Sequence, residues 1–252
     1  GVILGVGNQR SIAWSVAEHF HKEGAELALT YLTDSKGRFE SNVRKLGERV
    51  NASMIKDCDV SNDNSIKSLI NSLNDHWGEL DFLIHSLAFA EQKDLQIAFS
   101  STSRNGFAKA HEISAYSLLP LVEGVAPMMN KRGGGSIISM SFIGSILAVP
   151  HYHVMGPAKA SLEASSRYLA RELGPNNIRV NVISSGAIKT LSSAGIKDFA
   201  ELMRIGAEHS AMKRTVTQDE VAQTALFLAS EASSGITGQV IYVDCGYSIM
   251  AN

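Results

Sequence analysis

Tyr152 and Lys159, two residues whose side chains could take part in acid–base chemistry, lie seven positions apart in the chain. A tyrosine phenol has a pKa of about 10, so it acts as an acid only where something stabilises its phenolate. The ammonium group of a nearby lysine supplies such a charge. A step of seven residues returns to nearly the same face of a helix, so both side chains can serve one site. The alternative is a core tyrosine and an unrelated surface lysine.

The helix that carries Lys159 should begin close to Tyr152. Pro157 is tolerated in a first helical turn and not deeper, which places Tyr152 at or just before the helix start. The two histidines that flank it, His151 and His153, would point the same way if the segment were extended. Two such histidines can bind a metal, but without a third ligand nearby we expect an exposed pair or a subunit contact, and no metal site.

A glycine-rich turn follows the first apolar run of the chain. It reads Gly5-x-Gly7, then a longer gap, then Ser11-Ile12-Ala13. Such a turn lets the backbone approach a pyrophosphate, and the following helix N-terminus stabilises the negative charge. The complete G-x-G-x-x-G pattern is absent, so the motif alone is weak evidence for a dinucleotide. Ser11 can also serve as a helix N-cap, which is compatible with that role.

The elements that must position these residues alternate along the chain. Apolar runs predict strands over residues 2–5, 26–31, 53–60, 80–86, 137–141, 178–184 and 239–244. Helical spacing predicts helices over about 11–23, 37–50, 65–77, 103–129 and 217–231, and the helix that carries Lys159 is expected to run to about residue 173. Strands that alternate with helices predict an α/β protein, a doubly wound, seven-stranded parallel sheet of the Rossmann type.

The chain is predicted to form a single domain over residues 1–252, because no linker, repeat or low-complexity tract divides it. The segment of residues 185–216, between the sixth predicted strand and the next helix, is longer than a simple connection requires. Such insertions often bind ligands. Leu191, Ile196, Phe199, Leu202, Met203 and Ile205 would suit a small helical flap over an apolar substrate. The alternative is that the flap merely packs on a partner subunit.

Composition excludes several classes of protein. The net charge is −2, with no basic stripe, which argues against nucleic acid as a partner and against a membrane surface. Cys58 and Cys245 have no metal-like spacing and suit a reduced, cytoplasmic protein. The sequence opens at Gly1 inside an expected strand, so we expect a few native residues ahead of it.

The spacing of Tyr152 and Lys159 departs from the Tyr-x-x-x-Lys of most short-chain dehydrogenases/reductases, since position 155 is Met. It resembles that of the enoyl-acyl-carrier-protein reductases, a branch of the same superfamily. The turn from Gly5 to Ser11-Ile12-Ala13 is similar to theirs. So are further stretches, among them Lys159-Ala-Ser-Leu-Glu-Ala164, Gly195-Ile-Lys-Asp-Phe199 and Gly235-Ile-Thr-Gly-Gln-Val240.

The resemblance implies reduction of a trans-2-enoyl thioester in fatty-acid elongation, with Tyr152 stabilising and protonating the enolate and Lys159 holding the nicotinamide ribose. The cofactor-binding positions it implies are Gly5, Ser11, Ile12, Asp59, Val60, Ser86, Leu87, Lys159, Ile188 and Thr190. The substrate-binding positions it implies are Ala88, Phe142, Tyr152, Met155, Ile196 and Phe199. The chain departs from the family's usual pattern at Ala88 (often Gly), Phe142 (often Tyr) and Ala187 (usually Pro).

The cofactor is expected to be NADH rather than NADPH. No arginine or lysine stands directly after the second strand, where a 2′-phosphate would be neutralised, although Lys36 and Arg38 follow a little later. The resemblance also implies an acyl-carrier protein as partner and a homotetramer. Two alternatives stay open: a 3-ketoacyl-type carbonyl reductase of the same superfamily, and a nucleotide-binding module without catalysis.

Overall fold

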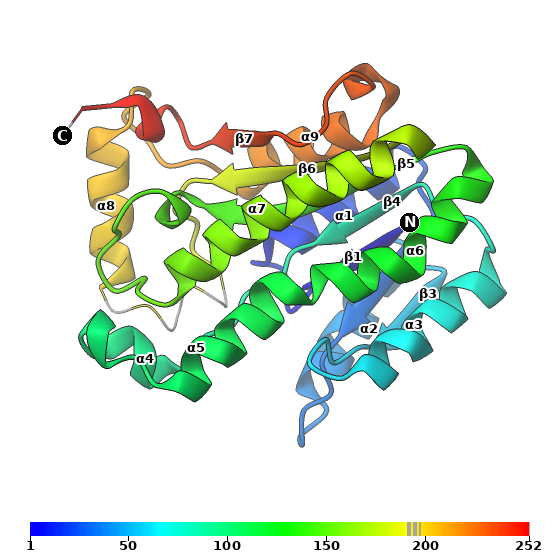
Figure 1. The fold of residues 1–252 in the computed structure, drawn as a ribbon, viewed down its shortest axis with the longest axis horizontal. Coiled ribbons are helices and arrows are strands. Elements are labelled where there is room, and N and C mark those ends of the chain that lie inside the picture. Colours follow the sequence, from blue (N-terminus) through cyan, green and yellow to red (C-terminus); the bar gives the residue numbers. More distant parts are fainter. Residues whose placement is uncertain (191–192, 194–195, 197, 252) are drawn as a thin grey trace.

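The computed structural model describes residues 1–190, 193, 196 and 198–251. Their strands form one parallel sheet in the order β3-β2-β1-β4-β5-β6-β7, with helices on both faces (Figure 1). The strands are β1 Val2–Leu4, β2 Ala28–Tyr31, β3 Met54–Asp57, β4 Phe82–His85, β5 Gly135–Phe142, β6 Ile178–Ser185 and β7 Val240–Val243. The predicted doubly wound, seven-stranded sheet is confirmed.

The α-helices are α1 Ile12–Lys22, α2 Arg38–Arg49, α3 Asp63–His76, α4 Gln92–Gln96, α5 Arg104–His111, α6 Leu118–Arg132, α7 Met155–Leu173, α8 Phe199–His209 and α9 Gln218–Ala229. The predicted helix over 103–129 is divided, because a π-helical turn at Glu112–Tyr116 separates α5 from α6. The helix α4 was not predicted. None of the helices in the described residues is long and apolar enough to cross a membrane.

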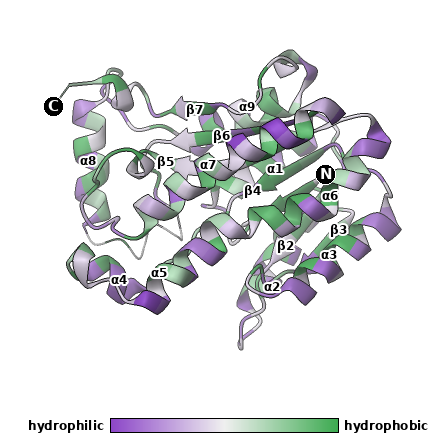
Figure 2. Cartoon of the chain, viewed as in Figure 1, coloured by the Kyte–Doolittle hydropathy of each residue, from purple (hydrophilic) through white to green (hydrophobic). Residues whose placement is uncertain are grey.

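Alternate residues of the buried strands supply two cores, one on each face of the sheet. Val2 and Leu4 of β1 pack in a core with α3, α6 and α7, whereas Ile3 between them packs with α1, α2 and α9. This is the alternation that a strand requires, since successive side chains point to opposite faces. The strands in the middle of the molecule accordingly carry many hydrophobic residues, and many hydrophilic residues lie along the outer helices (Figure 2).

Capping residues mark where several of the helices begin and end. Thr217 and Glu220 form a reciprocal capping box at the start of α9. Asn62 accepts backbone hydrogen bonds at the start of α3, and Gly133 in the left-handed conformation ends α6. Such caps satisfy backbone groups that a helix end leaves without partners.

The order of the strands reverses between β1 and β4, which are neighbours in the sheet although two strands separate them in the chain. In doubly wound sheets this point leaves a crevice at the carboxyl ends of the strands, where ligands bind. The glycine turn after β1 and the segment after β4 therefore border the crevice from both sides.

Candidate active site

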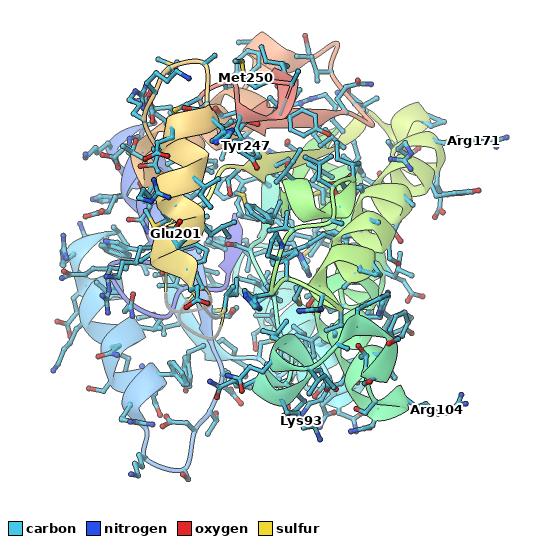
Figure 3. The ribbon with its side chains drawn as sticks, turned by 90° about the vertical axis from the view of Figure 1, so that its left-hand side faces the viewer. Lys93, Arg104, Arg171, Glu201, Tyr247 and Met250 are labelled. Atoms are coloured by element: carbon cyan, nitrogen blue, oxygen red, sulfur yellow. The ribbon has the colours of Figure 1, made fainter. Side chains whose placement is uncertain are left out.

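A cavity of about 390 Å³ lies at the carboxyl ends of β1, β4, β5 and β6. Most of the predicted site residues line it: Gly5, Ser11, Ile12, Ser86, Leu87, Ala88, Phe142, Tyr152, Met155, Lys159, Ile188, Thr190, Ile196 and Phe199. Figure 3 views the molecule from this side, where α8 carries Glu201 and α4 carries Lys93. The fold thus brings together positions that lie far apart in the sequence.

The turn after β1 passes unusually close to the end of β4. Gly5 has a φ of 98°, and a Cβ at this position would lie 2.0 Å from the carbonyl oxygen of Ser86. Ser11 shapes the same turn, because its Oγ donates to the carbonyl of Asn8 at 2.6 Å and accepts from the amide of Gly7 at 3.3 Å. The structure describes no capping bond from this side chain to α1. The turn lines the cavity directly before the N-terminus of α1, and a glycine-rich turn at a helix N-terminus is an arrangement that binds phosphate.

Tyr152 lies in the turn directly before α7, as Pro157 in the first turn of that helix predicted. The side chain is buried, and its ring centroid lies 4.8 Å from that of Phe142 at the end of β5. Gly144 makes room for it, since a Cβ there would lie 2.4 Å from Cδ1 of Tyr152. The phenol is therefore held from two sides at the wall of the cavity.

Lys159 reaches the same wall from the second turn of α7. Its Nζ donates to the carbonyl of Met140 at 2.7 Å and to that of Leu87 at 3.1 Å, and the side chain is buried. A lysine ammonium has three N–H groups, so one remains for a ligand. Burial lowers the pKa of Lys159 to about 8, and the charge of Glu163 opposes that shift.

The pKa of Tyr152 moves in the direction opposite to the one that the sequence suggested. Burial raises it above its ordinary value, and the charge of Glu163 raises it further. We expected the ammonium of Lys159 to stabilise a phenolate, but that ammonium is bonded to two backbone carbonyls. Tyr152 is therefore a neutral phenol at neutral pH, which suits a hydrogen-bond and proton donor.

The segment after β4 contributes apolar lining that the sequence did not assign to the site. It supplies Phe89, Ala90, Gln92 and Leu95, and further unassigned positions in the lining are Met140, Ser185, Gly186 and Ser193. The π-helical turn fixes part of this wall. Ser114 accepts from the amide of Phe89 at 3.0 Å, and its hydroxyl lies 3.9 Å from the sulfur of Met155. π-Helical turns occur frequently at functional sites. The sequence around Ser114 is typical of an ordinary helix, so it did not indicate a π-helical turn.

The described part of the predicted flap borders the cavity. Ile188, Thr190, Ile196 and Phe199 line it, and Phe199 begins α8, none of whose described residues is fully buried. The amide of Thr190 donates to Ser193 Oγ at 2.8 Å, which joins these two lining residues. Leu191, which we assigned to the flap, lies outside the described residues, as do Gly195 and Lys197 of the quoted stretch.

Two predicted cofactor residues lie apart from the others. Asp59 follows β3 and is exposed, where its Oδ1 accepts from the amide of Ser61 at 3.0 Å and from its hydroxyl at 2.7 Å. Val60 is buried in the core beside it. Neither is among the described residues that line the cavity, so their assignment to the cofactor stays a prediction.

His151 and His153 do not lie in an extended segment, and the prediction that they point the same way as strand neighbours is wrong. Both have positive φ, 60° and 39°, so the chain turns tightly on either side of Tyr152. Their rings lie 6.1 Å apart, and Nε2 of His151 is 3.8 Å from a carboxylate oxygen of Asp198. Among the described residues no group of three metal-binding side chains is found.

Comparison with known proteins points to one family. The sequence model of the Enoyl-(Acyl carrier protein) reductase family matches residues 5–248. An enoyl-[acyl-carrier-protein] reductase [NADH] of Nostoc sp. is 51% identical over 249 residues, which are 99% of this chain and 96% of that protein.

Solved structures agree with this match. The chain superposes on the enoyl-[acyl-carrier-protein] reductase (NADH) of Aquifex aeolicus VF5 with a TM-score of 0.95 and 41% identity, covering 100% of this chain and 96% of that one. The enoyl-(acyl-carrier-protein) reductase of Anaplasma phagocytophilum, solved in complex with NAD, gives a TM-score of 0.94 and 40% identity, covering 100% and 94%. Sequence, fold and site agree, and the chain belongs to the enoyl-acyl-carrier-protein reductase family.

Proposed function

We propose that the protein reduces the trans-2 double bond of enoyl-acyl-carrier-protein thioesters with NADH. The observation that carries this proposal is the placement of Tyr152 and Lys159 in one cavity, at the strand-order reversal and beside the glycine turn. Family membership sets the reaction class, and the neutral phenol of Tyr152 suits the proton donor that the reaction requires.

The residues present fit a nicotinamide dinucleotide. The glycine turn at Gly5 and Gly7 lines the cavity directly before α1, and Lys159 keeps one N–H free for a ribose hydroxyl. When bound, NADH would supply the hydride for the β-carbon of the substrate. Gly5, Ser11, Ile12 and Thr190 would lie at the pyrophosphate, with Ser86, Leu87 and Ile188 along the nicotinamide half.

The part of Tyr152 in this reaction is to donate a hydrogen bond to the thioester oxygen. Negative charge develops on that oxygen as the double bond is reduced, and a donor aimed there lowers the barrier. The proton of the phenol can then neutralise the enolate. Ala88, Phe142, Met155, Ile196 and Phe199 offer an apolar wall for the acyl chain, and α8 would cover it as a flap.

The partners and location follow the family. We propose that the acyl-carrier protein delivers the thioester, and that the enzyme is a cytoplasmic homotetramer, with neither nucleic acid nor membrane as a partner. Both cysteines are free and buried, which suits a reducing compartment. Phe107 and Tyr116 are exposed apolar side chains along α5 and the π-helical turn, where subunits could meet. Light scattering after gel filtration would measure the assembly.

The test of the proposed reaction follows nicotinamide absorbance with a short trans-2-enoyl thioester, using NADH and NADPH in parallel. We expect oxidation of NADH with this substrate and none with a 3-ketoacyl thioester. Oxidation with the ketoacyl substrate instead would favour a carbonyl reductase. Nucleotide binding without any oxidation would favour a module that binds without catalysis.

Gly144 provides a test of how tightly Tyr152 must be placed. Gly144→Ala puts a methyl group 2.4 Å from the tyrosine ring and forces the ring to move. We expect kcat to fall at least about tenfold, because small displacements of a reacting group are costly. Gly235→Ala is the matched control, since a Cβ there meets nothing within 4 Å. Unchanged turnover in Gly144→Ala would show that the ring position is not critical.

Asp34 is expected to disfavour NADPH. It follows β2, and its carboxylate accepts from Nε of Arg38 at 3.4 Å and from the amide of Phe39 at 3.2 Å. A 2′-phosphate at this corner would meet a negative charge and an arginine that is already paired. Asp34→Asn should therefore lower the KM for NADPH about fivefold relative to that for NADH.

The matched control for this change is Glu40→Gln, which removes the same charge from the pair with Arg44 on α2. That pair lies further along the helix, so we expect the ratio of the two KM values to stay unchanged. An equal effect of the two variants would mean that only net charge matters and that Asp34 has no special position.

A further inference from the structure

A buried carboxylate lies one helical turn beyond Lys159. Glu163 is on the same side of α7, four residues later, and only 5% of it is exposed. A glutamate is almost never buried without a partner, because taking its charge out of water is costly. None of the roles assigned above to the site residues uses this side chain.

The side chains of Glu163 and Lys159 form hydrogen bonds with two consecutive residues of β5. Ser141 Oγ donates to Oε1 of Glu163 at 2.5 Å, and the carbonyl of the preceding residue, Met140, accepts from Nζ of Lys159 at 2.7 Å. Both bonds are buried, where charge-assisted hydrogen bonds are strongest. The end of β5 therefore fixes both the carboxylate and the ammonium of α7 through adjacent residues.

Other titratable groups around the pair come from three further segments. His85 on β4 is fully buried with Nε2 2.8 Å from Ser117 Oγ, and burial followed by the charge of Lys159 lowers its pKa to about 3, so it is neutral. Tyr152 precedes the helix, and Tyr242 lies on β7. Burial followed by the charge of Glu163 raises the pKa of each tyrosine.

We propose that Glu163 is a positioning residue for Lys159. The hydrogen bond from Ser141 fixes the carboxylate of Glu163, and the negative charge of that carboxylate keeps Lys159 an ammonium up to alkaline pH. The carbonyl dipoles of Met140 and Leu87 alone do not supply a full counter-charge to a buried cation. The same negative charge adds to burial in raising the pKa of Tyr152. The proposal rests on the role of Lys159 in NADH binding given above.

The test measures NADH affinity against pH in the full-length protein by the fluorescence of the bound nucleotide. Glu163→Gln keeps the size and the acceptor for Ser141 but removes the charge. We expect the alkaline limb of the profile to move down by about one pH unit, so that affinity falls several-fold near about pH 8 and little near about pH 6. Glu163→Asp, which retains the charge, should restore most of the wild-type profile.

Glu172→Gln is the matched control, because it removes the same charge from an exposed position of α7 and should leave the profile unmoved. A loss of affinity in Glu163→Gln that is equal at both pH values would indicate a purely structural role and overturn the proposal. So would a profile that does not move at all.

An NMR titration of lysine labelled with ¹³C at Cε needs no nucleotide. It gives the midpoint of Lys159 in the wild-type protein and in Glu163→Gln, with Lys159→Arg identifying the signal. A midpoint that is lower in Glu163→Gln by about one pH unit supports the proposal, and equal midpoints in the two proteins overturn it. If the protein bound no NADH, the proposed function would fail, yet this titration would still decide the electrostatic role of Glu163.

Discussion

Tyr152→Phe should lower kcat for an enoyl thioester by about 100-fold or more and leave the dissociation constant of NADH unchanged. The change removes one hydroxyl and keeps the ring, which packs 4.8 Å from the ring of Phe142 and against Gly144. Phe142 has no hydroxyl with which to replace it. The effect should therefore fall on proton donation and on stabilisation of the developing charge, and not on the fold.

The measurement combines steady-state turnover with a titration of NADH fluorescence on the same preparation. Tyr168→Phe is the control, because it makes the same chemical change on α7 at a position that is 77% exposed. It should behave like the wild-type enzyme. Full activity in Tyr152→Phe would remove Tyr152 from the mechanism, and weaker NADH binding would mean that the hydroxyl also serves the cofactor.

The sheet could be predicted from the sequence because its strands are short apolar runs between helices of regular periodicity. Each predicted strand is present, with boundaries that differ by a few residues. The helix α4 carries no such periodicity. It has five residues and is fastened by a tertiary contact, in which the buried carboxylate of Asp94 accepts from the amide of Ser103 at 3.1 Å. A contact of this kind leaves no trace in local spacing.

The site likewise has features that sequence motifs predict and features that depend on contacts in the folded protein. Gly5 and Lys159 could be located from motif and spacing, and the fold brings both to one cavity. The positive φ of His151 and His153 could not be anticipated, because few residues other than glycine adopt it. The rise in the pKa of Tyr152 depends on burial and on Glu163, neither of which the Tyr–Lys spacing reveals.

Lys159→Ala should weaken NADH binding by about tenfold or more, since it removes a charged donor from the ribose. It should also destabilise the fold by about 3 kcal/mol, because the carbonyls of Leu87 and Met140 lose their buried partner and Glu163 is left without its counter-charge. Lys159→Met separates the two effects. Its stem fills the space of the lysine, so it should lose as much affinity and unfold at a higher temperature than the alanine variant.

The pH dependence provides the sharper measurement for Lys159. Its pKa is about 8, so its ammonium is present below that pH and is lost as the pH rises through it. NADH affinity of the wild-type enzyme should accordingly decline across about pH 8, whereas both Lys159 variants should show low affinity without that decline. If the alanine variant bound NADH as tightly as the wild type, the ribose contact would belong to another residue. If it retained the alkaline decline, another group would titrate there.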